Sequence, residues 1–337
     1  MSRRIRMVAV DMDGTLVGPD GQVSARNLVA VRAAERAGVE VVIATGRRHS
    51  YAMKVLRGLG LKEDNGLITS NGAVVRTVGA KLLERTLLSQ STGEWLCGHM
   101  GGFRSALLLT FDRVRPDGDD THGALVVEES GELQGSIGRW MTANERYIEK
   151  VVPIEGALGR EGMIQMMLCG TIERMRAAEA QLLRDPKVLG VGVAPLRKSE
   201  VRREGVAAPE VLPEAALHRT EYPERDLCIV DILPAGCSKG TAVMGLAAMR
   251  GVAREEILAI GDNWNDVSML EAAGASVLMG NAPDDLKEIG TARGWVAGSR
   301  HDQDGVAEAI EAALDGALTM SSGQMRGSRQ LYPDGRL

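Results

Sequence analysis

The stretch "VAVDMDGTLVG" (residues 8–18) sets a short apolar run directly before two carboxylates, Asp11 and Asp13. A run of this kind predicts a buried strand. Aspartate is a poor strand residue and is costly to bury. Two carboxylates brought together also raise each other's pKa unless a cation lies between them. The stretch therefore needs an explanation beyond packing.

A bound Mg²⁺ would supply that explanation, because Mg²⁺ takes one or two carboxylates together with phosphate oxygens and water. A calcium-binding EF-hand loop also begins with D-x-D, but it needs glycine at its sixth position. Here Gly14 stands at the fourth position, which excludes that loop. D-x-D alone is weak evidence, so the rest of the chain decides.

Composition limits the classes of protein that the chain can represent. Its 337 residues suggest about two domains. Hydrophobic residues at 44% and charged residues at 25% are typical of a globular protein. The net charge of −5 gives no electrostatic reason to expect nucleic acid or an anionic membrane as a partner. No apolar run is long enough for a membrane span, and Asp11 interrupts the N-terminal run before signal-peptide length.

The four cysteines form no C-x-x-C pair, which indicates free thiols in a reducing compartment. We therefore expect a cytoplasmic protein. Oligomeric state and the identity of any substrate are not predicted by the sequence.

Strands and helices alternate at both ends of the chain, which predicts an α/β fold with a Rossmann-like parallel sheet. The predicted strands are 7–10, 39–46, 66–75, 256–262 and 275–280, and the predicted helices are 24–38, 50–60, 239–251, 267–274 and 304–318.

The middle of the chain has a different pattern and predicts an inserted α+β module. Its expected strands are 105–111, 124–129, 163–170 and 188–195, with helices near 139–150 and 171–184. We expect a discontinuous core domain, an inserted domain with a long loop, and a disordered tail. The core domain is expected to comprise residues 1–83 and 226–318, and the inserted domain residues 84–225, with the loop at 197–225. The tail is expected to comprise residues 319–337.

Polar residues follow two further predicted strands or begin a predicted helix. Thr45, Gly46 and Arg47 end the second strand, where a hydroxyl and backbone N–H groups can cradle a phosphate. The alternative is a simple turn. Lys239 begins a helix, where the helix dipole disfavours a cation unless an anion shares the site. The alternative is a solvated surface lysine.

A third group, Asp262, Asn265 and Asp266, leaves another strand in "AIGDNWNDVSML". Asp262 could complete a metal shell, whereas Asn265 and Asp266 could also cap the next helix. Ligands bind outside the carboxyl ends of strands in open parallel sheets. These loops can therefore converge with Asp11, although they lie far apart in the sequence.

In this order, the stretches resemble the four motifs of the haloacid dehalogenase superfamily. The inserted module and "ITSNGA" (68–73) resemble the Cof-type subgroup, which carries a large C2-type cap domain. The four motifs are Asp11-Met12-Asp13-Gly14-Thr15, Thr45-Gly46-Arg47, Lys239 and Gly261-Asp262-x-x-Asn265-Asp266.

The resemblance implies a role for each motif residue. Asp11 would be the nucleophile that forms an aspartyl-phosphate, and Asp13 would be the general acid and base. Mg²⁺ would be held by Asp11, Asp262 and the backbone carbonyl of Asp13, with Asp266 in support. Phosphate or substrate would be bound by Thr45, Gly46, Arg47, Lys239 and Asn265.

The resulting hypothesis is a Mg²⁺-dependent phosphatase that hydrolyses a small phosphorylated metabolite, such as a sugar phosphate. A phosphomutase or phosphotransferase acting on sugar phosphates is the enzymatic alternative, and a catalytically silent phosphate-binding regulator is the other. A Rossmann dehydrogenase is disfavoured because the G-x-G at 190–192 lacks a third glycine and a following helix.

Overall fold

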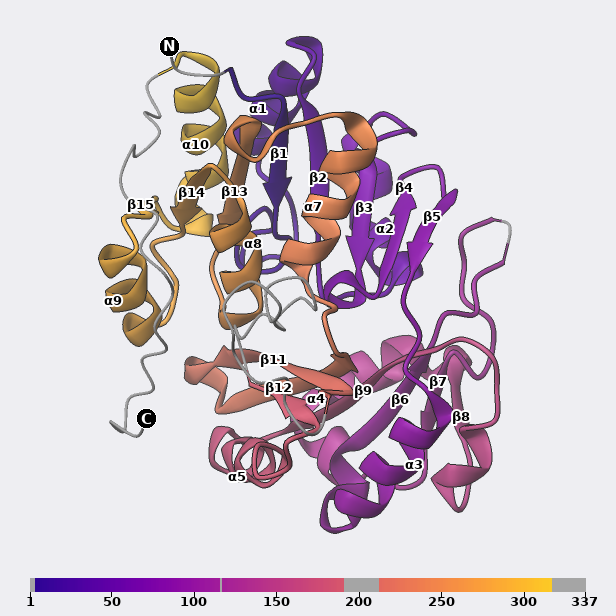
Figure 1. Ribbon diagram of the computed structural model, residues 1–337. Coiled ribbons are helices and arrows are strands. Elements are labelled where there is room, and N and C mark those ends of the chain that lie inside the picture. Colours follow the sequence, from indigo (N-terminus) through magenta and orange to yellow (C-terminus); the bar gives the residue numbers. More distant parts are fainter. Residues whose placement is uncertain (1–3, 116, 191–211, 317–337) are drawn as a thin grey trace.

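The computed structural model describes residues 4–115, 117–190 and 212–316. These residues form two sheets, each with its own hydrophobic core, stacked as a core domain and a cap domain (Figure 1). The core sheet has the strand order β15-β14-β13-β1-β2-β3-β4-β5, and the cap sheet has the order β10-β11-β12-β9-β6-β7-β8. Within the described residues, no helix is both long and apolar enough to cross a membrane.

The core sheet is parallel from β15 to β3, and the β3–β4–β5 edge is antiparallel. This arrangement confirms the predicted α/β class. The core strands are β1 (Met7–Val10), β2 (Glu40–Ala44), β3 (Gly66–Thr69), β4 (Val74–Thr77), β5 (Leu82–Arg85), β13 (Ile257–Gly261), β14 (Ala275–Leu278) and β15 (Val296–Ala297). The core helices are α1 (Ala25–Arg36), α2 (His49–Leu56), α7 (Lys239–Arg250), α8 (Val267–Ala272), α9 (Asp284–Ala292) and α10 (Gly305–Leu314).

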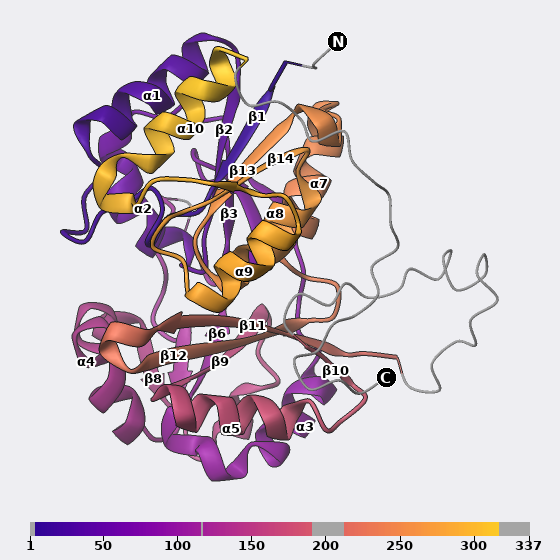
Figure 2. The same cartoon turned by 90° about the vertical axis from the view of Figure 1, so that its left-hand side faces the viewer.

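Helices cover both faces of the core sheet, as the continuous apolar strands predicted. Val8 and Val10 pack in the layer that contains α1, α2 and α10. Met7 and Ala9 point the other way and pack with residues of α7, α8 and α9. Figure 2 shows the two helix layers on either side of the sheet. Because helices cover both faces, the sheet is open to the cap only at the ends of its strands.

The cap sheet lies opposite the carboxyl ends of the core strands (Figure 1). Its outer face packs against α3 and α5, while α4 packs on part of the inner face, toward the core. The cap strands are β6 (Leu107–Phe111), β7 (Leu125–Val127), β8 (Ile148–Lys150), β9 (Met163–Gly170), β10 (Val188–Leu189), β11 (Ala215–Tyr222) and β12 (Leu227–Pro234). The cap helices are α3 (Gln90–His99), α4 (Gly131–Asn144) and α5 (Ile172–Leu182).

One expected domain boundary is wrong. Residues 226–234 were assigned to the core, but β12 pairs antiparallel with β9 and β11 in the cap sheet. The chain therefore returns to the core only after β12. An apolar run predicts a buried strand without indicating its sheet, which explains the error.

The expected loop at 197–225 is also corrected in part, because residues 215–222 form β11. The second half of its sequence, AALHRTEY, is polar and does not predict a strand. These polar side chains bond to neighbouring elements instead of facing solvent. Glu221, for example, pairs with Arg176 of α5. Residues 197–211 and the tail 319–337 lie outside the described residues.

Two smaller differences concern single elements. The expected strand at 66–75 is a hairpin, in which residues 70–72 separate β3 from β4. The helix expected near 139–150 is α4, which begins at Gly131.

Ion pairs join the two domains. Asp112, just after β6, accepts hydrogen bonds from Arg76 Nη2 of β4 at 2.9 and 3.0 Å and from Arg85 Nη1 at 3.3 Å. Its side chain is only 4% exposed. Arg48, at the start of α2, likewise pairs with Asp120 and donates to Asn144 Oδ1 of the cap at 2.7 Å. These contacts fix the cap over the core.

We predict that Asp112→Ala lowers the free energy of unfolding by about 3–5 kcal/mol, because it leaves a largely buried Arg76 without its partner. Urea denaturation followed by circular dichroism measures this loss. Glu311→Ala is the matched control, since Glu311 pairs with Arg26 at an exposed site where both side chains are 46% exposed. Its loss should stay below about 1 kcal/mol. Equal losses for the two variants would contradict the prediction.

Candidate active site

The carboxyl ends of the core strands bring the predicted site residues together, as expected for a parallel sheet. Asp11 follows β1, Thr45 follows β2 and Asp262 follows β13. Lys239 is the first residue of α7, which starts opposite these strand ends. Ser238 caps this helix and exchanges hydrogen bonds with Thr241 in a capping box, which fixes the position of the helix start.

Lys239 is the centre of a buried ion cluster. Its Nζ lies 2.5 Å from Asp11 Oδ1 and 2.7 Å from Asp266 Oδ1. Its side chain is 0% exposed, which excludes the alternative of a solvated surface lysine. Although burial alone would lower it, the charges of Asp11 and Asp266 raise the pKa of Lys239 above its usual value. The ammonium therefore stays charged.

The carboxylates of the cluster still exceed its positive charge. Burial and the charge of Asp266 raise the pKa of Asp11 to about 7, despite its contact with Lys239. Burial and the charges of Asp11 and Asp266 raise the pKa of Asp262 well above its usual value. Both shifts indicate carboxylates that lack enough countercharge.

Asp262 is held from three sides. Its Oδ1 accepts from the Thr15 hydroxyl at 2.8 Å, and its Oδ2 accepts from Asn281 Nδ2 at 3.1 Å. Gly14 permits this approach: it has φ +82°, and a Cβ there would lie 2.4 Å from Asp262 Oδ2. The glycine of the D-x-D-G sequence is therefore required by the packing of Asp262.

The donor set fits a Mg²⁺ ion. Oxygens of Asp11, Asp262 and Asp266 all lie within 4.8 Å of one another. Three carboxylates against one ammonium leave an excess charge that a divalent cation would neutralise. Both oxygens of Asp266 are engaged, one by Lys239 and the other by the backbone N–H groups of Asp262 and Asn263. Asp266, which is tied to the backbone of its own loop, therefore orients Lys239 and the loop, and Asp11 and Asp262, whose partners here are side chains, are the candidate ligands.

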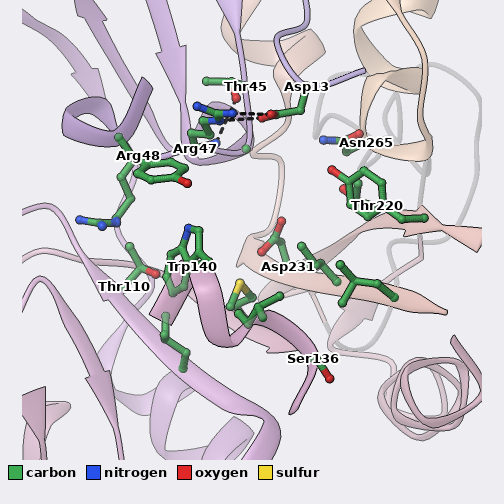
Figure 3. A pocket seen from close by; sticks show the side chains of 18 of the residues that line it. Asp13, Thr45, Arg47, Arg48, Thr110, Ser136, Trp140, Thr220, Asp231 and Asn265 are labelled. Carbon is green, nitrogen blue, oxygen red and sulfur yellow. Dashed lines mark hydrogen bonds and ion pairs between the residues drawn. The ribbon is translucent and has the colours of Figure 1, made fainter. Parts of the chain in front are cut away.

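Asp13 is paired with Arg47 at the mouth of the site (Figure 3). Arg47 Nε and Nη2 donate to the two carboxylate oxygens of Asp13 at 2.8 and 2.5 Å. The Asp13 side chain is 37% exposed, against 6% for Asp11. Asp13 is thus accessible from the cavity, and the guanidinium of Arg47 is directed to this carboxylate.

Thr45, Gly46 and Asn265 lie around a strained turn that follows β3. In this turn Ser70 and Asn71 have φ of 48° and 51°, which non-glycine residues seldom adopt. Gly46 leaves room for it, since a Cβ there would lie 3.3 Å from the Asn71 amide. Asn265 Nδ2 donates to Asn71 Oδ1 at 3.0 Å. The turn therefore belongs to the site.

Sequence reasoning missed several polar residues here. Asn281 follows β14 and donates to both Asp262 and the Gly14 carbonyl. The rule that selected Asp262, a polar residue just after a strand, would also have selected Asn281. Thr15 and Asn71 stood inside quoted motifs but were given no role. Their partners are distant in sequence, so only the structure shows their function.

A cavity of about 880 Å³ opens over this site. The loops after the core strands and the start of α2 line one side, and α4 and the inner face of the cap sheet line the other. Such a volume suits a small organic molecule. An organic molecule that fills this cavity would therefore contact both domains.

The sequence is similar to those of named phosphatases over most of its length. The 5-amino-6-(5-phospho-D-ribitylamino)uracil phosphatase YwtE of Bacillus subtilis is 29% identical, over 93% of this chain and 99% of its own length. The HMP-PP phosphatase of Serratia proteamaculans is 28% identical, over 84% of this chain and 87% of its own.

Solved structures share the fold. A haloacid dehalogenase-like hydrolase from B. subtilis has a TM-score of 0.65 at 24% identity, covering 91% of this chain and 99% of its own. The haloacid dehalogenase-like hydrolase family matches residues 8–99 and 215–310, more than half of the chain. The match and the phosphatase relatives confirm the expected enzyme class, a phosphoric monoester hydrolase resembling the Cof-type subgroup. The chain belongs to the haloacid dehalogenase-like hydrolase family.

Proposed function

We propose that this enzyme is a Mg²⁺-dependent phosphatase that hydrolyses a small phosphorylated metabolite through an aspartyl-phosphate on Asp11. The observation that carries the proposal is the buried Asp11 carboxylate, 2.5 Å from the Lys239 ammonium, on the core side of a cavity that the cap also lines. The relatives support the substrate class, because one is named for a phosphorylated ribitylaminouracil.

In the proposed reaction, Asp11 attacks phosphorus and the ester oxygen leaves. Lys239 holds the nucleophile and offsets the negative charge of the phosphoryl group. Thr45, the backbone of Gly46, and Asn265 would bind the phosphoryl oxygens. Bound by Asp11, Asp262 and the backbone carbonyl of Asp13, Mg²⁺ would supply charge neutralisation and orientation.

Asp13 would protonate the leaving oxygen and later take a proton from the hydrolytic water. It is suited to this role because it is exposed to the cavity, unlike Asp11. The bidentate contact from Arg47 fixes the orientation of its carboxylate. Each oxygen keeps a further lone pair through which Asp13 can bond to the leaving group or to water. Arg47 therefore acts chiefly on Asp13 in this proposal.

The cap would limit the access of water and select the leaving group. Transfer to a sugar hydroxyl differs from hydrolysis only in the group that reaches the aspartyl-phosphate. Product analysis by phosphorus NMR separates the two reactions. We further propose a cytoplasmic location, because all four cysteines are free and buried.

The first test is hydrolysis of p-nitrophenyl phosphate. We expect turnover with Mg²⁺, none with EDTA, and a loss of at least about 10³-fold in Asp11→Asn, which removes the nucleophile. Asp20→Asn, an exposed carboxylate outside the cavity, serves as the control and should retain full activity. Equal turnover in wild type and Asp11→Asn would refute the proposed nucleophile.

A second prediction concerns Mg²⁺ binding without turnover. At about 100 times its dissociation constant, a ligand stabilises the folded state by about 2.7 kcal/mol. We therefore expect Mg²⁺ to raise the Tm of the wild type by several degrees in differential scanning calorimetry. Asp262→Asn should lose this response. Without Mg²⁺ this variant should be at least as stable as the wild type, because one of the repelling buried carboxylates is gone.

A third prediction separates backbone strain from the packing of Asp262. Gly14 and Gly21 have similar φ, +82° and +78°, but a Cβ on Gly21 meets no atom within 4 Å. Alanine in a left-handed conformation costs about 1–2 kcal/mol at either position. Only Gly14→Ala should also displace Asp262, with a loss of about 10²-fold in kcat/KM. Similar activity losses in both variants would show that strain alone matters.

A further inference from the structure

The turn in "ITSNGA" joins the catalytic core to a carboxylate of the cap. Asn71 Oδ1 accepts from Asn265 Nδ2 at 3.0 Å, and its Nδ2 donates to Asp231 Oδ2 at 2.6 Å. Because Asn265 donates to one end of the Asn71 amide, the other end must present its N–H to Asp231. A left-handed Asn71 is a strained conformation that is typical of functional sites.

Asp231 lies on the inner face of the cap sheet. In the strand register it stands opposite Met167 of β9 and His218 of β11. Its second oxygen, Oδ1, accepts from Gln165 Nε2. The two oxygens of a carboxylate offer about four acceptor positions, and these two amides occupy one on each oxygen.

No cation pairs with this carboxylate among the described residues, although the residue is only 4% exposed. Neutral amides compensate a buried charge only in part. Burial accordingly raises the pKa of Asp231 to about 7, against the opposing effects of the bonds from Gln165 and Asn71 and of the charge of Lys239, with which it forms no ion pair. A buried carboxylate with spare acceptor positions therefore lacks a partner.

The cavity is a place from which a partner can reach this carboxylate. Asp231 lines it, and in Figure 3 its carboxylate points into the space below Asp13 and Arg47. Trp140 of α4 lies beside this space. Its ring meets the Tyr51 ring edge to face, with centroids 6.4 Å apart. The same compartment thus offers an aromatic wall and an acceptor that carries negative charge.

We propose that Asp231 is a specificity-determining residue that binds an amino group on the leaving-group part of the substrate. The substrate class is then a phosphomonoester whose organic part is a ring bearing an amine. This inference rests on the proposed phosphatase function. A second phosphate at this position is disfavoured, since it would face a carboxylate. A hydroxyl would donate one hydrogen bond but leave the charge of Asp231 uncompensated.

The alternative is a purely structural role, in which Asp231 only joins the cap to Asn71. Two matched pairs of phosphomonoesters separate the roles. One pair is pyridoxamine 5′-phosphate and pyridoxine 5′-phosphate, and the other is glucosamine 6-phosphate and glucose 6-phosphate. Each pair differs by an amino group in place of a hydroxyl group. If the role of Asp231 is purely structural, its substitution should change the binding of both members of a pair equally.

Binding is measured first, by titration calorimetry on the full chain carrying Asp11→Asn, so that the result does not depend on turnover. We expect the amine of at least one pair to bind about 10-fold or more tightly than its hydroxyl partner. Adding Asp231→Asn should remove this preference while leaving the affinity for the hydroxyl compound within about 2-fold. Met167→Leu, opposite Asp231 in the register, is the control and should keep the preference.

Turnover then gives an independent reading in the chain with Asp11 intact. Asp231→Asn should raise the ratio of KM for the preferred amine to KM for its hydroxyl partner about 10-fold, whereas Met167→Leu should leave this ratio unchanged. Equal losses on both members of a pair, or no amine preference in either pair, would overturn the inference. Amine-selective binding without turnover of any compound would instead leave the inference standing and refute the phosphatase.

Discussion

The contact of the Lys239 ammonium with Asp11 and Asp266 is the interaction on which the site depends. It places a positive charge in a region with no access to water, where it is worth far more than at a surface. It also requires helix α7 to begin beside the ends of β1 and β13. Three segments that are distant in sequence are therefore held in register by one buried ammonium. The carboxylates that remain uncompensated define where a divalent cation would bind.

Glycines make this close approach possible. Gly14 lets Asp262 lie against the first loop, and a Cβ on Gly72 would lie 2.2 Å from the Ser238 carbonyl, just before Lys239. A Cβ on Gly261 would lie 2.6 Å from that of Asp266. Each of these glycines brings backbone close to a residue of the ion cluster. The geometry of the site is thus determined as much by missing side chains as by the charged ones.

The sequence predicted the α/β class of the core and the convergence of its charged residues at the strand ends, because these signals are local. Asp11 and Asp262 each end an apolar run, with Asp13 two residues after the first, and that pattern needs no knowledge of the partner strand. The cap boundary failed because the apolar run at 226–234 does not indicate which sheet it joins. Asp231 stands in this run as Asp11 stands near the end of its own, but the core assignment hid its meaning. Partners such as Asn71 and Asn281 became visible only when distant loops were brought together.

The two domains divide the work in different ways. In the proposed reaction the core residues would contact the phosphoryl group, which all substrates of such an enzyme share, so their arrangement would follow from phosphorus chemistry. The inner face of the cap would contact the part of the substrate that differs between metabolites. Asn71 belongs to the core, yet its amide bonds to Asp231 of the cap and to Asn265 beside the ion cluster. Two hydrogen bonds therefore connect the proposed leaving-group site to the proposed catalytic residues, and any movement of the cap must break or carry along the first of them.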